Sequence, residues 1–245
     1  MNNRLATALT SAWPKALIGA LLLGGSVTAN ADPEISANVT LASDYSFRGV
    51  SQTGRDPAIQ GGFDVAWENG FYVGTWSSNV KFGITSQEID VYLGYAGQIN
   101  EDVGYDVSYI RYEYPGAGSE LDYNELAASL SYGAFTLGLG YSNEYFNLDN
   151  VTWFYPNIGY SLSLPQDAAL DFYVGVSIVD DNSSDDWVGS FGEEEVIDWS
   201  VTYTIPLGGV DVGLAVVGTD VSKSDCFGGS KDCSTRAIVS LSKSL

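Results

Sequence analysis

Large apolar residues alternate with small or polar ones through most of the chain after residue 31. The segment AFTLGLGYS sets one apolar face against one small, polar face: Phe135, Leu137, Leu139 and Tyr141 against Thr136, Gly138, Gly140 and Ser142. A period of two residues is typical of a β-strand whose two faces meet different surroundings. The pattern predicts about twelve strands, near residues 38–48, 58–68, 71–80, 87–98, 103–114, 122–132, 134–146, 152–164, 169–180, 195–205, 210–220 and 234–245.

The connections between these segments alternate in length. Short ones lie at residues 68–70, 100–102, 133, 165–168 and 206–209, and longer polar ones fall between them, including 180–195 and 222–233. An even-stranded antiparallel barrel has short turns at one rim and long loops at the other. We therefore predict an all-β fold, an antiparallel transmembrane β-barrel over residues 32–245, with both of its ends on the short-turn, periplasmic side.

A secreted, soluble β-sandwich is the alternative, because its sheets also alternate apolar and polar positions. Two features oppose it. The face opposite the apolar one is nearly free of Lys and rich in Gly, whereas a soluble sheet carries charges of both signs there. Aromatic residues also gather near strand ends, as in the girdles of membrane barrels. These aromatic residues are Tyr45, Phe47, Trp67, Phe71, Tyr95, Tyr105, Tyr132, Phe135, Tyr141 and Tyr203.

The first 31 residues differ from the rest. Basic Arg4 and Lys15 precede an apolar run at 16–29, and small residues at 29–31 form a cleavage site. This layout predicts a secretory signal peptide over residues 1–31, too short to span a bilayer as a helix. Without Arg4 and Lys15, 8 basic residues stand against 31 acidic ones, a net charge of −23. Such a polyanion is a poor partner for nucleic acid and a suitable host for cations.

Chemical motifs are few. The chain contains no His, so a Ser-His or Asp-His hydrolase arrangement cannot be assembled, and it has no nucleotide-binding fingerprint. We expect no enzyme, no cofactor and no metal centre. Cys226 and Cys233 flank a Gly-Gly turn, and export to an oxidising compartment predicts a disulfide between them. The acidic loop 180–195 matches no EF-hand spacing, which favours a solvated loop over a calcium site.

The stretch SDYSFRGVSQTGRDPAIQGGFD at residues 43–64, followed by ENGFYVGTWSSNV at 68–80, resembles the start of a proteobacterial exported family of unknown function described as TorF-type porins. The pieces S-D-Y-x-F-R-G-x-S-Q-T, P-A-x-Q-G-G and G-F-Y-x-G-x-W-x-S-N-V occur in order, and the rest of the chain shares only the strand rhythm. The resemblance implies an outer-membrane location and a pore. It implies no substrate and no catalytic residues.

The strand register predicts which charged residues face the lumen. We expect Arg48 to point inward at the loop end of the first strand, among acids that line the pore and set its selectivity. These acids are Asp44, Asp64, Glu88, Asp90, Asp106, Glu125 and Asp171, and the other inward basic residue is Arg236. Two interpretations of Arg48 stay open. It forms a constriction with the acids, or it only neutralises them and fixes the first hairpin.

The predicted function is that of a narrow outer-membrane pore that contacts lipid and passes small, mainly cationic, solutes or ions by diffusion. About twelve strands lie between filled eight-stranded barrels and open sixteen-stranded porins. The alternative is a non-conducting barrel whose outer loops bind a ligand or partner. Its lumen would be plugged by Tyr92, Trp153, Tyr155 and Tyr173.

Overall fold

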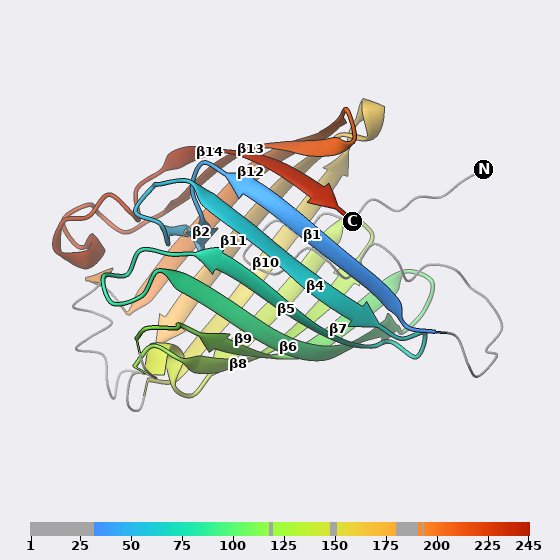
Figure 1. Ribbon diagram of the computed structural model, residues 1–245, viewed down its shortest axis with the longest axis horizontal. Coiled ribbons are helices and arrows are strands. Elements are labelled where there is room, and N and C mark those ends of the chain that lie inside the picture. Colours follow the sequence, from blue (N-terminus) through green and yellow to red (C-terminus); the bar gives the residue numbers. More distant parts are fainter. Residues whose placement is uncertain (1–31, 118–119, 148–150, 180–190, 193) are drawn as a thin grey trace.

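The computed structural model describes residues 32–117, 120–147, 151–179, 191–192 and 194–245. The predicted signal peptide and most of the acidic loop 180–195 lie outside these residues. Twelve antiparallel strands close into one barrel, with the longer loops gathered at its left end in Figure 1. Within the described residues, no helix has the length and apolar character needed to cross a membrane.

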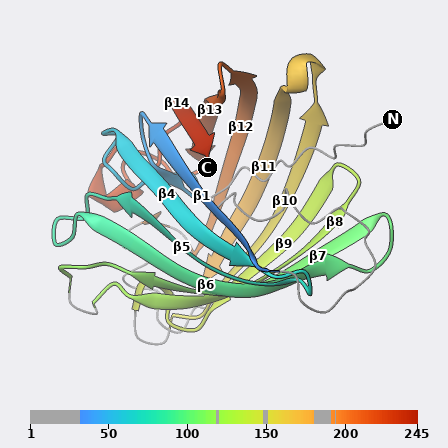
Figure 2. The same cartoon turned by 45° about the vertical axis from the view of Figure 1, so that its right-hand side comes forward.

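Each barrel strand pairs with its neighbours in sequence order, and the last strand pairs with the first to close the ring, as the turned view in Figure 2 also shows. The barrel strands are β1 (Glu34–Ala42), β4 (Ala58–Ala66), β5 (Phe71–Asn79), β6 (Gln87–Gln98), β7 (Val103–Glu113), β8 (Tyr123–Tyr132), β9 (Phe135–Ser142), β10 (Trp153–Ser163), β11 (Ala169–Val179), β12 (Glu195–Leu207), β13 (Val210–Thr219) and β14 (Arg236–Ser244). Short 3-10 turns cover Tyr145–Asn147, Pro165–Asp167 and Cys226–Gly228. The predicted fold class is therefore confirmed.

The first strand was predicted to run to residue 48, and this is wrong. The strand β1 ends at Ala42, and residues 43–57, here called the inner hairpin, fold into the barrel. Two short strands, β2 (Ser46–Phe47) and β3 (Val50–Ser51), pair across a two-residue turn. Both turn residues, Arg48 and Gly49, have positive φ, 47° and 78°, as a tight type I′ hairpin turn requires. The alternation of apolar and polar residues continues past residue 42 because the backbone of the inner hairpin is also extended.

The outward face of the barrel is apolar, as predicted. Large side chains on alternate strand positions lie exposed on it, among them Ile35, Leu93, Val107, Leu137, Val174, Leu214 and Leu241. Aromatic rings at Phe71, Tyr95, Tyr132 and Phe135 lie exposed at the short-turn ends of their strands. Tyr45 and Phe47, predicted for the aromatic girdle, are instead buried in the inner hairpin because the strand ends before them.

The interior is packed at one end and looser at the other. Toward the loop end, every barrel strand points a buried residue inward: Ala42, Ala58, Ser78, Glu88, Tyr112, Glu125, Ser142, Trp153, Val179, Asp198, Thr219 and Arg236. Toward the short-turn end, several strands present small or polar residues that are half-buried, including Asn38, Thr40, Ser129, Ser131, Thr136, Asn157, Ser200, Thr202, Ser240 and Ser242. The inner hairpin and the aromatic rings around it thus fill the loop end of the lumen.

Inward glycines make this packing possible. They leave room inside the barrel, and rings from adjacent strands occupy that room. A Cβ added at Gly175 would lie 2.1 Å from the Tyr155 hydroxyl, and one added at Gly94 would lie 2.4 Å from the Tyr72 ring. Such distances are far inside van der Waals contact, so a side chain at either glycine would displace the ring.

We predict that Gly175→Ala destabilises the folded barrel by about 1–3 kcal/mol, because the buried Tyr155 must move to admit one methyl group. The control is Gly159→Ala on β10, where the nearest atom to the added Cβ is 3.9 Å away. That variant should unfold at the wild-type urea concentration or slightly above it. Urea unfolding monitored by tryptophan fluorescence compares the two, and equal midpoints would contradict the packing described.

Candidate constriction in the lumen

Arg48 lies at the tip of the inner hairpin and reaches across the lumen to β8. Its Nη2 atom donates to both carboxylate oxygens of Glu125, at 2.8 Å each, and its Nη1 atom donates to the Tyr145 hydroxyl at 3.2 Å. Arg48 is 7% exposed and Glu125 is 1% exposed, so the ion pair is removed from water. Charge-assisted hydrogen bonds of this kind are about twice as strong as neutral ones. They attach the hairpin tip to the opposite wall.

Aromatic rings surround the guanidinium group of Arg48. Its central carbon lies 4.0 Å from the centre of the Trp153 ring and 4.4 Å from those of Phe47 and Tyr155. The Trp153 ring also stacks on Tyr145, with centres 4.5 Å apart and planes 4° apart. Stacking of this cation on ring faces is favourable and is stronger where water is excluded. The surroundings therefore hold Arg48 in a left-handed backbone conformation that an Arg seldom adopts.

The Arg48 guanidinium group and the Tyr145 hydroxyl group each keep one protonation state at neutral pH. Burial alone would lower the pKa of Arg48, but the Glu125 carboxylate beside it raises that pKa well above its usual value. Burial raises the pKa of Tyr145 to about 12, although Arg48 opposes the shift. Arg48 is therefore a cation and Tyr145 a neutral phenol at neutral pH.

The other predicted lining acids all face the interior, where Tyr hydroxyl groups bind three of them. Tyr45 donates to Glu88 at 2.6 Å, Tyr72 donates to Asp106 at 2.8 Å, and Tyr92 donates to Asp64. Asp171 is buried on β11. These acids line the interior at several depths and do not form one ring.

Two of the predicted acids differ sharply in their surroundings. Asp90 is 5% exposed, and its Oδ1 atom meets no hydrogen-bond donor among the residues that the structure describes. Asp44 accepts hydrogen bonds from Ser51 at 2.6 Å and Thr53 at 2.8 Å, and it pairs with Arg236. Asp44 therefore anchors the base of the inner hairpin, whereas Asp90 is a carboxylate without a counter-ion beside it. In the described part of the chain, no three His, Cys, Asp or Glu side chains are placed to hold a metal ion.

Two residues that lie near Arg48 in the structure, Asp198 and Tyr145, were not predicted from the sequence. Asp198 is 3% exposed and accepts a hydrogen bond of 2.7 Å from Tyr155, which in turn accepts one of 2.9 Å from Tyr173. The alternation of Val196, Asp198 and Ser200 along β12 was a usable signal for its inward direction. Tyr145 lies in a 3-10 turn after β9, and no periodic pattern predicts where a loop residue points.

The four aromatic residues predicted to plug a non-conducting lumen, Tyr92, Trp153, Tyr155 and Tyr173, are all buried inside the barrel. Trp153, Tyr155 and Tyr173 lie together on β10 and β11, and the first two contact Arg48 of the inner hairpin. Tyr92 lies apart from them, against Asp64 on β4 and Tyr72 on β5. Charged residues and aromatic residues therefore occupy the same part of the lumen.

The closed antiparallel barrel is similar in fold to a known porin, as comparison with solved structures shows. The chain belongs to the family described as "Bacterial protein of unknown function (Gcw_chp)", which matches residues 26–245. No curated protein matches the sequence.

Among solved structures, the NanC porin is similar in fold, with a TM-score of 0.53 and 10% identity over 85% of this chain and 98% of that one. The outer membrane protein OprD from Pseudomonas aeruginosa aligns with a TM-score of 0.40 and 11% identity, over 86% of this chain and 65% of that one. At these identities the likeness concerns the fold.

We predict that Glu125→Gln destabilises the folded barrel by about 3–5 kcal/mol, because it leaves the Arg48 cation buried without its counter-charge. Lys81→Met is the control, since the ion pair of Lys81 with Asp56 is exposed and solvent screens it. That variant should keep the wild-type unfolding midpoint in urea. A Glu125→Gln barrel as stable as the wild type would show that the Arg48 pair does not hold the hairpin tip.

Proposed function

We propose that this chain is an outer-membrane channel of the TorF-type porins, exported with loss of residues 1–31, that passes small and preferentially cationic solutes. The inner hairpin is its constriction. The observation that carries the proposal is the placement of Arg48 at the hairpin tip, across the lumen from Glu125 and among buried inward acids. A loop folded into a barrel and fixed to the far wall sets the width of any path through it.

The outward face supports a position in a membrane. Exposed Leu, Ile, Val and Phe side chains cover alternate positions of most strands, and an apolar surface this extensive is unfavourable in water. Closure of the sheet also pairs the backbone groups of every barrel strand with neighbours, as hydrocarbon surroundings require.

The charge of the interior supports a preference for cations. Seven inward acids (Asp64, Glu88, Asp90, Asp106, Glu125, Asp171 and Asp198) share the lumen with Arg48, while the second inward Arg, Arg236, pairs with Asp44. A lumen lined by carboxylates raises the local concentration of cations and repels anions. Among the described residues, no Arg or Lys forms an ion pair with Asp90, so the inward acids outnumber the basic side chains that face them.

Passage through the loop end requires the inner hairpin to move, since the inward residues of all twelve strands are buried at that level. The same observation favours a second candidate function, a barrel that does not conduct and whose outer loops bind a ligand or partner. The two candidates differ in whether the hairpin ever leaves the position described here.

Conductance across a planar bilayer separates these candidates. The purified protein should open in discrete steps and give a cation-selective reversal potential in a KCl gradient. Asp90→Asn should move that potential toward zero without loss of folding, because it removes an inward carboxyl group that no Arg or Lys pairs with among the described residues. Asp102→Asn, in the exposed turn between β6 and β7, should leave it unchanged. A folded but silent barrel would favour the binding function, and an unaltered potential in Asp90→Asn would contradict the acidic constriction.

The position in the membrane has its own test. We predict that Val174→Arg, at the middle of β11 on the outward face, destabilises the barrel in lipid vesicles by about 2–4 kcal/mol. Leu207→Arg, at the short-turn end of β12, should cost about 0–1 kcal/mol because the charge reaches water there. Folding in vesicles over a urea series measures both. Equal, small effects would show that the outward face does not meet hydrocarbon.

A further inference from the structure

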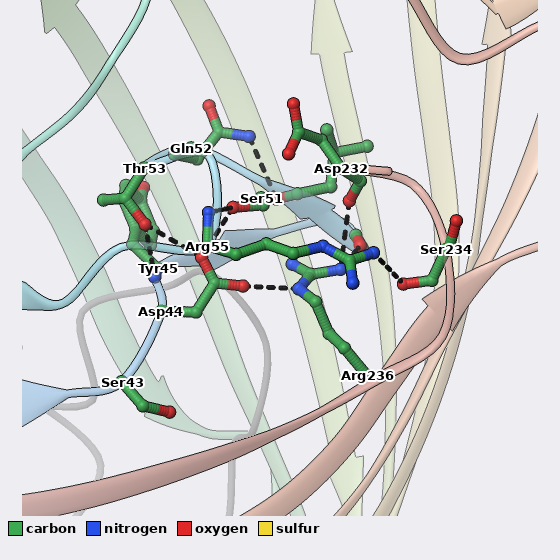
Figure 3. Close-up of polar contacts among 12 residues, drawn as sticks. Ser43, Asp44, Tyr45, Ser51, Gln52, Thr53, Arg55, Asp232, Ser234 and Arg236 are labelled. Atoms are coloured by element: carbon green, nitrogen blue, oxygen red, sulfur yellow. Dashed lines mark hydrogen bonds and ion pairs between the residues drawn. The ribbon is translucent and has the colours of Figure 1, made fainter. Parts of the chain in front are cut away.

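The base of the inner hairpin is bound by the loop that joins β13 to β14 and contains the disulfide Cys226–Cys233, as Figure 3 shows in part. The Ser51 backbone N–H donates to the carbonyl oxygen of Asp232 at 3.0 Å. The Arg55 guanidinium donates to the carbonyl oxygen of Lys231, and to that of Ser234 at 3.2 Å. Three backbone carbonyl groups within four residues of this loop therefore receive donors from the inner hairpin.

Arg236, the first residue of β14, also contacts both the inner hairpin and the disulfide loop. Its Nε atom pairs with Asp44 at the start of the hairpin. Its Nη1 atom donates to the carbonyl oxygen of Gly49 in the hairpin turn at 2.7 Å, and to that of Asp232 at 3.1 Å. Figure 3 shows the Arg55 and Arg236 side chains lying side by side between the hairpin and the loop. One buried side chain thus connects the hairpin's beginning, its turn and the disulfide loop.

The disulfide fixes the backbone that supplies these acceptors. Both sulfur-bearing residues are fully buried, and the carbonyl oxygen of Cys233 accepts from the Thr219 backbone at 3.2 Å and from its hydroxyl at 3.0 Å. Between the two Cys lie Gly228 and Gly229, which have positive φ and open space around them. Glycines give this segment a large backbone entropy when it is not closed. The covalent bond removes much of that freedom and so positions the carbonyl groups of residues 231–234.

We propose that the loop closed by Cys226–Cys233 is the catch that holds the inner hairpin in the lumen, and that breaking the disulfide releases the hairpin. Release leaves the hairpin attached through Arg48 and Glu125 at its tip, through Tyr45 and Glu88, and through Arg236 and Asp44. A dithiol would break the bond by giving two electrons and two protons, leaving two Cys thiols and a dithiol oxidised to its own disulfide. The consequence for solute passage rests on the function proposed above, but the release of the hairpin does not.

Trypsin reports release without any reference to conduction. The Arg48–Gly49 bond is protected in the wild type because Arg48 is buried in the lumen. In Cys226→Ala/Cys233→Ala, cleavage at this bond should be at least about tenfold faster, since proteolysis follows the population of the open form. Cleavage after Arg111, on the outer wall and paired with Asp122, serves as the internal reference and should not change. Mass spectrometry of the peptides gives both rates.

A second variant keeps the disulfide and removes only contacts. Arg55→Gln loses the donors to the carbonyl groups of Lys231 and Ser234 and should speed cleavage at Arg48 by a smaller factor. Arg111→Gln is its matched control, and both assays take their internal reference from cleavage after Lys243, which lies exposed at the short-turn end of β14. If the double Ala variant fails to fold, as judged by heat-modifiable migration on a gel, dithiothreitol added to folded wild-type protein replaces it.

The outcomes test two proposals separately: that the disulfide loop is the catch that holds the hairpin, and that the barrel conducts. Faster cleavage at Arg48 together with more frequent bilayer openings supports both proposals. Faster cleavage in a barrel that stays silent supports the catch and overturns conduction. Unchanged cleavage at Arg48 in folded protein without the disulfide overturns the catch, whatever the conductance shows.

Discussion

The buried ion pair between Arg48 and Glu125 is the interaction on which the arrangement of the lumen depends. A guanidinium group and a carboxylate leave water at a large cost, which is offset only when each finds the other and further partners. The rings of Trp153, Phe47 and Tyr155 and the Tyr145 hydroxyl supply those partners. Because Arg48 is carried on a short hairpin, satisfying its charge brings residues 44–53 inside the barrel.

Glycine and tyrosine make the space for this hairpin and then fill it. Inward glycines on one strand receive the rings of the next, as Gly175 receives Tyr155 and Gly94 receives Tyr72. The tyrosine hydroxyl groups then bind carboxylates that would otherwise be buried without donors, at Glu88, Asp64, Asp106 and Asp198. A strongly acidic interior can therefore be packed without an equal number of basic residues.

The hairpin is attached both at its tip and at its base. Its tip is held by the ion pair of Arg48 with Glu125, and its base by the ion pair of Asp44 with Arg236 and by hydrogen bonds to a backbone segment that a disulfide closes. Two separate attachments allow one end to be released while the other still guides the segment. In a barrel whose sheet has no free edge, a loop of this kind is the element best able to change the width of the lumen.

The sequence by itself determined the barrel: the period-two alternation, the alternating lengths of the connections and the spacing of Cys226 and Cys233 were enough for the strand order, the apolar outer face and the disulfide. It also placed Arg48 among inward acids, but on a first strand extended to residue 48, whereas the structure carries Arg48 into the lumen on the inner hairpin. Only the tertiary structure decided that the first strand ends at Ala42 and that Tyr145 and Asp198 join the cluster. Alternation describes one strand and its two faces, whereas ion pairs such as Arg48 with Glu125 join residues far apart in the chain and form only when the barrel closes.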